Sequence, residues 1–570
     1  MANIKKYICI EFKIEQHSGK LIPENKLSFR DEEKLKSGGI IYIYKGPKDM
    51  YVGQTKEFYK RHLAHCKEEC GKYINGTYDR VIVAFNDTLI NKASLDDIEK
   101  QFITYITADN ENTDVSVNNK TEGNTSIDYP NKDEVVSDFI LPYWSELYKR
   151  GYVNKKELND VKQSILFKYS PFFSLSTEQQ TVIDGIINSE SNCIVYGLAG
   201  TGKTVLITNL AVQLLNNKPD AKIAVVAQTN WVESGKKIFE KYGAKNVIVD
   251  TAYKIGTLGE YFDYIIVDES HRLRRYYSKT NHIRDDVFGL YYDEKLKKNM
   301  PKYNELTRLV DISKKLVLFY DPLQSIRPTD IQPKEFHDAL QKNAFIQFTL
   351  RKEYRVTIND KDNRFDGDDF INGILSVLQL DDRPFNKELF REYLTEGDDA
   401  YFGIVNSIGE LFNYLDVQEM YNSYTINRVL AGYTREWISK GKGGEEKYDW
   451  TEGDTGRWKW NKTNENWINS KNSRQEIGCI HAIQGADLNY VGVIVSDDLK
   501  INGDVLYGDV NAYKDRNGKF AITDFDQRAF DEYIKNIYYV LLTRGISGLR
   551  VYFENKDVEK YFKKYMGICE

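Results

Sequence analysis

The sequence predicts an α/β multidomain fold, in which a small mixed α/β unit is followed by two domains built on parallel sheets. At 570 residues the chain is too long for one hydrophobic core, so at least three domain-sized units are expected. Its 41% hydrophobic content is enough to fill them. From residue 174 onward, apolar strands alternate with amphipathic helices, a rhythm typical of doubly wound parallel sheets.

The N-terminal unit is expected between about residues 37 and 108, where short β-rich runs and charged helical segments alternate. A turn composition, Lys-Gly-Pro-Lys-Asp, separates the first two runs. Ser94 is a candidate N-cap for the last helix because acidic residues occupy the turn after it. In chain order we expect strands at 39–44 and 50–53, a helix at 58–72, a strand at 80–84 and a helix at about 94–106.

The two parallel-sheet domains are expected around a less regular, charged stretch at about 356–475. Apolar runs at 192–196, 222–227, 264–267 and 315–319 indicate the first domain, and runs at 491–495 and 549–553 end the second. A polar stretch at 108–132 separates the N-terminal unit from helical sequence at 133–170. The expected domains are 1–125, a helical connector at 126–172, 173–335, and 336–570 with an insertion at about 356–475.

Charge and composition restrict where the chain is expected to work. The net charge is −6 and the sequence pI about 5.9, so any nucleic-acid site must be local instead of a globally basic surface. The six scattered cysteines fit a reducing cytoplasm and not a disulfide framework. The sequence shows neither a signal-peptide core nor an apolar run of membrane-spanning length. A cytoplasmic protein without membrane contact is therefore expected.

The strongest motif runs from Gly197 to Thr204, Gly-Leu-Ala-Gly-Thr-Gly-Lys-Thr, between an apolar strand and a helical segment. Its glycines, including Gly200 and Gly202, let backbone N–H groups close around a β-phosphate, and the helix N-terminus adds partial positive charge. Lys203 is expected to reach the β- and γ-phosphates, and the Thr204 hydroxyl to bind Mg²⁺. The motif predicts an ATP site.

An acidic pair follows the apolar run at 264–267 and is expected to complete the ATPase centre. Asp268 is placed to hold Mg²⁺ through its outer shell, and Glu269 to orient and deprotonate the attacking water. Such a pair at a strand end is often only a cap. Downstream of a P-loop, it is more often the hydrolytic centre.

Further motifs resemble those of superfamily 1 helicases. They are Leu-Ser-Thr-Glu-Gln-Gln at 175–180, Phe-Tyr-Asp-Pro-Leu-Gln at 319–324, Leu-Arg-Lys-Glu-Tyr-Arg at 350–355, His-Ala-Ile-Gln-Gly at 481–485 and Val-Leu-Leu-Thr-Arg at 540–544. As a set they resemble the Schlafen-type helicase domain over about residues 174–555. The resemblance implies two RecA-like domains that use ATP and Mg²⁺. Tyr320 stands where superfamily 1 more usually has glycine, so this loop is atypical.

The same resemblance implies roles for individual residues. Arg355 and Arg544 would act as arginine fingers that neutralise charge developing during phosphoryl transfer. Gln179 would contact adenine and Gln324 would sense the γ-phosphate. Gln484 and Gly485, from the motif at 481–485, complete the expected nucleotide-binding set.

Two features bear on how such a motor would work. The chain leaves no room between residues 230 and 264 for the large accessory insertion of processive superfamily 1 helicases, which puts robust strand separation in doubt. A tryptophan cluster is compatible with a stacking platform for single-stranded bases, although packing of a small folded segment is favoured. Its members are Trp450, Trp458, Trp460 and Trp467.

A second constellation lies in the N-terminal unit. Tyr42 and Tyr51 fall in the two expected strands, within Gly-Ile-Ile-Tyr and Tyr-Val-Gly. Arg61 and His65 are four residues apart and therefore share a helix face, and Glu99 lies on the later helix. Over about 37–120 these residues resemble the GIY-YIG nuclease superfamily, with one extra residue between the first glycine and tyrosine. The superfamily's late asparagine corresponds to Asn118, and Asn119 is equally possible.

This resemblance implies metal-dependent hydrolysis of phosphodiester bonds. Glu99 would anchor one Mg²⁺ or Mn²⁺, and the planar guanidinium of Arg61 would clamp phosphate oxygens. Tyr42 or Tyr51 would orient or deprotonate the water, with His65 as the alternative base. A decayed, binding-only copy of the domain is the alternative interpretation, but no member of the set is visibly lost.

The fusion of these two parts resembles bacterial restriction-like or antiphage nuclease-helicase proteins. The first interpretation is a translocase that feeds nucleic acid, DNA rather than RNA, to the nuclease. The second is a nuclease gated by nucleotide, and the third a nucleic-acid-binding ATPase with an inactive nuclease fold. A homo-oligomer and a phage-derived trigger are compatible with all three, and defence rests on analogy alone.

Overall fold

A computed structural model describes residues 8–15, 18–67, 76–86, 89–119, 131–162, 164–173, 175–275, 290–293, 298–301, 304–326, 330–358, 364–392, 400–422, 425–440, 443–444, 446–463, 467–483, 487–515 and 527–568. Contacts between Cα atoms divide the chain into two compact units. Met1–Gln180, Thr204–Asp220 and Ser234–Val247 form the first unit, and Thr181–Lys203, Ala221–Glu233 and Ile248–Glu570 form the second.

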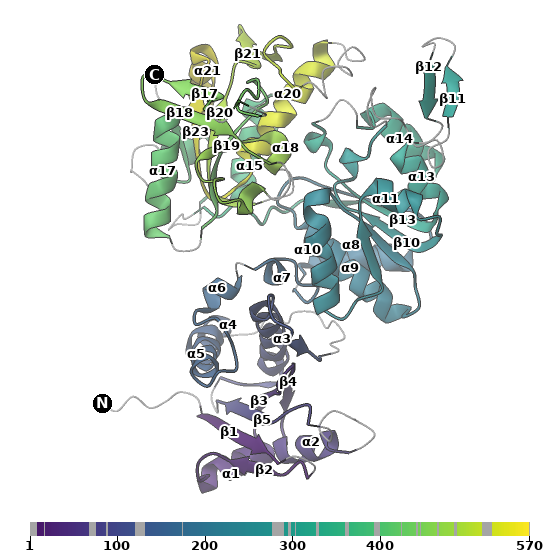
Figure 1. Cartoon of the computed structure of the whole chain (residues 1–570), viewed down its shortest axis with the longest axis vertical. Helices are drawn as coiled ribbons and strands as arrows, with labels where there is room; N and C mark the ends of the chain where they lie inside the picture. The colour runs from purple at the N-terminus through teal and green to yellow at the C-terminus, as the bar shows by residue number, and fades with distance from the viewer. Residues whose placement is uncertain are drawn as a thin grey trace. The chain divides into compact units, whose positions relative to one another are not determined.

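The N-terminal part of the first unit is a six-stranded sheet with the order β2-β1-β5-β3-β4-β6. Its described pairs are antiparallel apart from β4 and β6, and α3 packs against β3 and β4 (Figure 1). The elements are β1 (Ile8–Ile14), β2 (Leu21–Pro23), α1 (Phe29–Ser37), β3 (Ile40–Lys45), β4 (Asp49–Thr55), α2 (Phe58–His65), β5 (Arg80–Phe85), α3 (Lys92–Asp109) and β6 (Ser116–Val117). The strands β1 and β2 precede the β-rich segment expected from residue 37.

Two expected helix ends are wrong. The α2 helix ends at His65 and does not run on to residue 72, because the Cys66 amide bonds back to the carbonyls of His62 and Leu63 and closes the last turn. The α3 helix begins at Lys92, and Asn91 is its N-cap. Ser94 is instead the third residue of the helix, where its hydroxyl completes a reciprocal capping box with Asn91.

Short helices follow the N-terminal sheet, as the sequence predicts for residues 133–170. The α6 and α7 helices pack against α3. Asp109, the last residue of α3, accepts hydrogen bonds from the backbone amides of Asn154 and Lys155 at 2.7 and 2.8 Å. These contacts attach the helical segment to the N-terminal sheet. Its elements are α4 (Lys132–Val135), the π-helical turn η2 (Val136–Ile140), α5 (Leu141–Lys149), α6 (Leu158–Lys162), α7 (Ile165–Lys168) and α8 (Thr177–Asn188).

The first parallel sheet has the strand order β14-β7-β13-β10-β8-β9. β14 pairs with β7, so this sheet extends past the boundary expected at 335/336. β11 and β12 form a separate antiparallel hairpin. The elements are β7 (Cys193–Gly197), α9 (Lys203–Asn217), β8 (Ile223–Val226), α10 (Thr229–Lys241), β9 (Val247–Asp250), α11 (Ala252–Thr257), β10 (Phe262–Val267), η3 (Ser270–Arg272), β11 (Leu290–Asp293), β12 (Lys298–Pro301), α13 (Glu305–Asp311), β13 (Ser313–Tyr320), η4 (Pro322–Gln324), α14 (Pro333–Lys342) and β14 (Ile346–Leu350).

The second sheet has seven strands in the order β15-β23-β20-β16-β19-β18-β17. β16 lies inside the expected insertion at 356–475, yet it pairs in parallel with both β19 and β20. That stretch is therefore part of the domain core and not an insertion. The elements are α15 (Gly367–Val377), α16 (Glu388–Glu392), β15 (Phe402–Val405), α17 (Ile408–Tyr421), β16 (Asn427–Ala431), β17 (Trp450–Glu452), β18 (Gly456–Trp460), η5 (Trp467–Asn469), β19 (Glu476–Cys479), α18 (Ile480–Ile483), β20 (Leu488–Val495), β21 (Leu499–Asn502), β22 (Val505–Gly508), α20 (Gln527–Leu542), β23 (Gly545–Phe553) and α21 (Lys556–Met566).

Helices and aromatic side chains complete the core around this sheet. α17 packs across β16, β20 and β23 (Figure 1). Trp450, Trp460 and Trp467 are buried, and the half-buried Trp458 stacks on Phe412 with ring centroids 5.4 Å apart. The tryptophan cluster therefore packs the fold, as favoured above. Of the helices that the structure describes, none combines the length and the apolar character needed to cross a membrane.

Candidate functional site

The P-loop connects β7 to α9 and takes a conformation that its glycines permit. Gly200 and Gly202 have φ angles of 80° and 79°, in the left-handed region that side chains with a Cβ rarely adopt. A Cβ on Gly200 would also lie 1.8 Å from a carboxylate oxygen of Glu353. At Gly197 a Cβ would lie 2.6 Å from the Thr201 hydroxyl. The glycine pattern is thus required by backbone shape and by close packing together.

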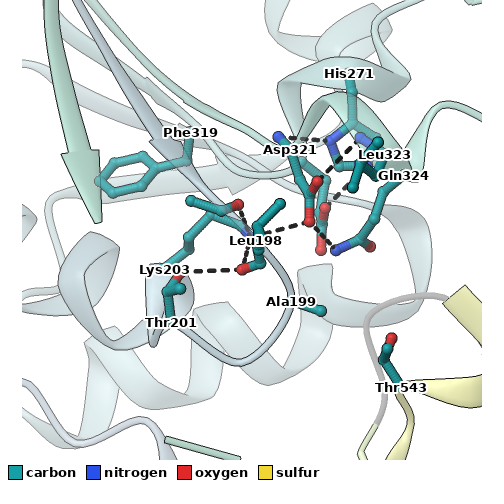
Figure 2. A network of polar contacts seen from close by, with 12 residues as sticks. Leu198, Ala199, Thr201, Lys203, His271, Phe319, Asp321, Leu323, Gln324 and Thr543 are labelled. Atoms are coloured by element: carbon teal, nitrogen blue, oxygen red, sulfur yellow. Dashed lines mark hydrogen bonds and ion pairs between the residues drawn. The ribbon is translucent and has the colours of Figure 1, made fainter. Parts of the chain in front are cut away.

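Lys203 begins α9, and its side chain returns to the loop that precedes it. The buried ammonium donates to the carbonyl oxygens of Gly197 at 2.7 Å and Leu198 at 2.9 Å. It also lies 3.8 Å from Oδ2 of Asp321 (Figure 2). A cation is therefore held inside the loop by neutral carbonyl oxygens and one carboxylate.

Asp321, to which no sequence pattern assigned a role, joins Lys203, His271 and Gln324 into one network. The residue is fully buried, and its Oδ2 accepts from the side-chain amide Nε2 of Gln324 at 2.7 Å. Its backbone N–H donates to Nδ1 of His271 at 3.3 Å, which leaves the other ring nitrogen to carry the proton. Figure 2 shows Asp321 between the lysine and the glutamine. The residue follows an apolar strand directly, as Asp268 does, and that position was the available clue.

Glu269 sits at a strained backbone position next to this network. Its φ of 51° is in the left-handed region, which is uncommon for a residue other than glycine. Nε2 of His271 lies 3.0 Å from its carboxylate. Burial alone would raise the pKa of Glu269, but His271, Lys203 and Arg544 outweigh burial and hold the pKa well below its usual value. The carboxylate is therefore ionised and oriented at neutral pH, as a water-activating group must be.

The two predicted arginine fingers come close to each other. The buried Arg544 donates from Nη2 to Oε1 of Gln324 at 3.1 Å. Arg355 donates from Nη1 to the Thr543 carbonyl at 3.1 Å and pairs with Asp487 at 2.8 Å. Burial and the neighbouring Arg355 lower the pKa of Arg544. The second parallel sheet thus supplies Arg544 to the Lys203–Asp321–Gln324 network.

Two further residues, both distant from it in the sequence, touch the P-loop and were not predicted. The Ala199 amide donates to the hydroxyl of Tyr539, a residue 340 positions away, at 3.3 Å. Glu353 covers Gly200, and its carboxylate accepts from the Arg355 amide at 2.7 Å. Burial raises the pKa of Glu353 to about 7. Contacts between positions so far apart in sequence leave no local pattern to find.

The remaining predicted ATP-site residues have fewer described contacts with the rest of the site. Thr204 is half-buried in the first turn of α9, and the buried Asp268 follows β10. The side-chain oxygen of Gln179 accepts from the Ser176 amide at 3.1 Å, and Ser176 caps the Gln179 amide in return, so Gln179 completes a capping box. Gln484 and Gly485 lie outside the described residues.

In the N-terminal unit, the structure brings Tyr42, Arg61 and His65 together. The Tyr42 hydroxyl accepts from Nε of Arg61 at 3.4 Å and lies 3.3 Å from Nε2 of His65. The Tyr51 ring lies 6.2 Å from the Tyr42 ring and 5.7 Å from the His65 ring, centroid to centroid. Burial, followed by Tyr51, raises the pKa of Tyr42, and burial and Glu99 raise that of Tyr51. Four of the five predicted residues therefore form one cluster.

Tyr42 is 0% exposed and lies across Gly53, the residue opposite it in the β3–β4 hairpin. A Cβ on Gly53 would fall 2.3 Å from both Cζ and the hydroxyl oxygen of Tyr42. The glycine of the Tyr-Val-Gly stretch is therefore required for the hydroxyl to reach Arg61 and His65.

Glu99, the fifth predicted residue, is half-buried on α3 and acts electrostatically on Tyr42, Tyr51 and Arg61. Burial, with a smaller contribution from Asp96, raises the pKa of Glu99 to about 7. Two carboxyl groups with few compensating charges suit a hard divalent cation. Within the described residues, no group of three or more His, Cys, Asp or Glu side chains could hold a metal ion.

The structure distinguishes the two asparagines left open by the sequence. Asn119 pairs with both backbone polar groups of Val52, accepting at 3.0 Å and donating at 2.7 Å, and so fixes the strand beside Tyr51. Asn118 donates instead to Asp49 at 2.7 Å. A neighbouring pair was missed: His62 lies 2.7 Å from the Gly19 carbonyl and 2.7 Å from the Tyr44 hydroxyl. Because a carbonyl only accepts, Tyr44 donates to Nδ1 of neutral His62.

Residues 190–555 match the family model of the Schlafen group 3 DNA/RNA helicase domain. The match covers more than half of the chain and includes the P-loop, both acidic residues and both predicted arginine fingers. The chain belongs to this family. Its Schlafen group 3 helicase domain is a helicase-like ATPase with parallel-rich α/β sheets, as the motif resemblance implied.

Relatives of the chain add limited information. The uncharacterized protein YPL245W of Saccharomyces cerevisiae is 25% identical over 405 residues, which are 64% of this chain and 82% of the yeast protein. The Pif1 helicase from Candida albicans is 13% identical with a TM-score of 0.31, over 70% of this chain and 100% of its own. The Bacteroides Pif1 helicase in complex with ADP-AlF3 and ssDNA has a TM-score of 0.28 at 13% identity, over 69% and 98%. Scores of this size support no structural argument, so the assignment rests on the helicase-domain match.

Proposed function

We propose that the chain is an ATP-dependent nuclease-helicase, in which the Schlafen group 3 helicase domain drives or positions nucleic acid for cleavage by the N-terminal unit. The observation that supports cleavage is the shared hydroxyl of Tyr42, contacted by Arg61 and His65 and under the electrostatic influence of Glu99. Phosphodiester hydrolysis needs an activated water, neutralisation of charge on the phosphate and a proton for the leaving oxygen, and these groups can supply all three. DNA is the proposed substrate, and defence against invading nucleic acid is the proposed role, by the resemblance described above.

In the proposed nuclease, each side chain has a defined task. Arg61, exposed on α2, binds the non-bridging oxygens of the scissile phosphate. His65 is the partner through which the Tyr42 hydroxyl can lose its proton, since Arg61 already occupies an acceptor site on that oxygen. Tyr51, the more exposed phenol, is the better placed of the two to meet water. Glu99 would hold Mg²⁺ or Mn²⁺, which would supply neutralisation of developing charge.

In the proposed ATPase cycle, Lys203 would bind the β- and γ-phosphates, and Thr204 and Asp268 would hold Mg²⁺. Glu269, ionised and oriented by His271, takes the proton of the attacking water. Gln324 lies between Asp321 and Arg544, so it can report the γ-phosphate to the second sheet. Arg355 and Arg544 neutralise charge in the transition state.

One observation favours a second candidate, in which nucleotide gates the nuclease without translocation. Tyr539 and Glu353 already touch the P-loop at Ala199 and Gly200 in the structure. In this candidate, a nucleotide that enters the loop displaces these contacts and so shifts the chain between two states. The two candidates differ in whether the chain must complete repeated cycles of hydrolysis.

Glu269→Gln is expected to separate the two candidates. Glutamine keeps the shape but removes the base, so ATP should bind and remain unhydrolysed, with turnover lowered about 100-fold or more. Under translocation, cleavage of long duplex DNA should fall sharply while cleavage of a short accessible duplex persists. The initial cleavage rates of the long and the short duplex, measured at equal molar concentrations of DNA ends, give the comparison.

Asp263→Asn is the control and should leave both cleavage rates unchanged. Asp263 is half-buried and lies earlier on β10, where its carboxylate accepts from the Lys222 backbone amide at 3.0 Å. Equal inhibition or equal activation of long and short substrates by Glu269→Gln would contradict translocation and favour the gate.

Gly53→Ala is expected to lower cleavage about 100-fold, because the new Cβ would displace the Tyr42 hydroxyl from Arg61 and His65. The displaced, buried ring should also lower the melting temperature, since overpacking a core typically costs about 1–3 kcal/mol. Gly409→Ala is the matched control, because the nearest atoms to its Cβ would lie 3.7 and 3.8 Å away, at ordinary contact distance. Parent-like cleavage by Gly53→Ala would show that the position of the Tyr42 hydroxyl is not needed.

A further inference from the structure

A cavity of about 350 Å³ lies in the second unit where α17 ends and β16 begins. Its volume falls in the range of small-ligand sites, about 300–1,000 Å³. The cavity is polar, and its polar side chains come from the end of α17, from β16 and from the segment around η5. They are Glu419, Asn422, Thr425, Arg428 and Arg474.

Arg428 lines this cavity and is only 7% exposed. Its Nη1 donates to the Asn427 carbonyl at 2.7 Å, and its Nη2 donates to the Ser473 hydroxyl at 2.8 Å and to the Ile468 carbonyl. Its Nε–H is buried and has no hydrogen-bond partner among the residues that the structure describes. A guanidinium buried to this degree normally has all its donors satisfied, so an acceptor is missing at Nε.

The charge of Arg428 faces an aromatic ring and not a carboxylate, with Cζ 5.9 Å from the centroid of the Trp467 ring. In the described parts of the chain, no carboxylate lies within ion-pair distance of it, whereas Arg474 contacts Glu419. Glu476 acts on Arg428 only from a distance, since its Oε2 accepts from the Trp467 indole at 2.8 Å. Burial lowers the pKa of Arg428 to about 10. A buried cation beside a cavity is expected to be matched by an anion.

We propose that this cavity binds a small ligand through a phosphoryl group, whose charge offsets that of the Arg428 guanidinium at the cavity wall. Asn422 and Thr425 line the same cavity and suit a polar ligand body, such as the sugar of a nucleotide. A free phosphorylated metabolite and a nucleic-acid backbone present the same group. This proposal depends neither on the nuclease nor on ATP hydrolysis.

The cavity lies at an edge of the sheet that also carries ATPase residues. Ile426, which lines it, exchanges hydrogen bonds with Asn489 at 2.9 and 2.8 Å. Asn489 follows Asp487 by two residues, and Asp487 is the ion-pair partner of Arg355. A bound phosphoryl ligand would therefore sit at the amino end of β16, beside β20, the strand that Asp487 precedes.

The test is calorimetric titration of the full chain, with the ATP site filled by ADP and Mg²⁺. Inorganic phosphate, AMP and a short single-stranded DNA are the three probes. The parent and Arg528→Gln, whose side chain is 89% exposed, should bind at least one of them equally. Arg428→Gln should weaken that binding at least about tenfold, as expected when a charged hydrogen-bond donor is lost.

Arg428 also donates hydrogen bonds to the Ile468 carbonyl and the Ser473 hydroxyl. A second variant therefore changes the charge of the cavity wall and leaves those hydrogen bonds in place. Arg474→Gln leaves Glu419 unpaired at the cavity, and its side chain is 59% exposed, so the fold should be kept. It should weaken binding several-fold at an unchanged melting temperature. Binding of phosphate and AMP but not DNA identifies a free ligand, and the reverse identifies a strand. Absence of binding by all three probes, or parent-like affinity in both variants, would overturn the proposal.

Discussion

Replacing Lys203 by alanine is expected to lower ATP turnover at least about 100-fold, as removal of one preorganised electrostatic group from a transition-state site does. The ammonium is buried inside the P-loop, where it bonds to Gly197 and Leu198 and lies 3.8 Å from Asp321. Alanine removes the charge that would meet the β- and γ-phosphates. It also leaves the fully buried Asp321 without that cation. Steady-state phosphate release in the presence of nucleic acid and Mg²⁺ measures the effect.

Lys222→Ala is the matched control, because the Lys222 side chain is 62% exposed and pairs with Glu260, which is itself 42% exposed. Its turnover should equal that of the parent. Near-parent turnover by Lys203→Ala would mean that the P-loop is not the site of hydrolysis, and would remove the basis for the roles of Asp321, Glu269 and Arg544.

Replacing Glu99 or Arg61 by alanine is expected to lower nucleic-acid cleavage at least about 100-fold while ATP turnover persists. Glu99 is the proposed metal-anchoring carboxylate, and Arg61 donates to Tyr42 at 3.4 Å. Lys60→Ala is the control for Arg61, since the neighbouring Lys60 side chain is 79% exposed and contacts only Glu57 among described acidic groups. Cleavage of a labelled short duplex with and without Mg²⁺ gives the readout. Cleavage within a few-fold of the parent in either variant would show that the site is misplaced.

The pH dependence of the same reaction is a second readout of Glu99. Burial raises the pKa of this carboxyl to about 7, and only the ionised form binds a cation well. At limiting Mg²⁺, cleavage should therefore rise as the pH increases through about 7 and fall below it. A cleavage rate that stays flat from about pH 6 to 8 at limiting Mg²⁺ would exclude Glu99 as the metal-binding group.

Much of the ATPase site could be predicted from sequence because its motifs are local. The P-loop, the acidic pair after β10 and the stretch at 319–324 each follow a buried strand, and parallel strands bring their carboxyl ends to one edge. The identity of the residues in the nuclease-like cluster could also be predicted from the sequence. Its geometry was not, since the approach of Tyr42 to Arg61 depends on the glycine opposite Tyr42 in the hairpin.

The sequence could not predict which strands pair when they lie far apart along the chain. β16 (Asn427–Ala431) pairs with strands that begin at residues 476 and 488. Because its partners come so much later in the chain, the irregular sequence around β16 suggests an insertion. β14 lies beyond β7 at the edge of the first sheet, so that sheet extends past the expected domain boundary. At α3, Asn91 and Ser94 are both N-cap residue types, and only the backbone shows which of them precedes the helix.

The central claim is that one chain holds two separate active centres, one hydrolysing ATP and one cutting nucleic acid. It is tested most directly by measuring ATP hydrolysis and Mg²⁺-dependent cleavage of a short duplex side by side in the parent, Lys203→Ala and Glu99→Ala. We expect both activities in the parent, loss of ATP hydrolysis alone in Lys203→Ala, and loss of cleavage alone in Glu99→Ala. A parent chain that hydrolyses ATP and binds DNA or RNA but cuts neither would contradict the claim and leave a nucleic-acid-binding ATPase.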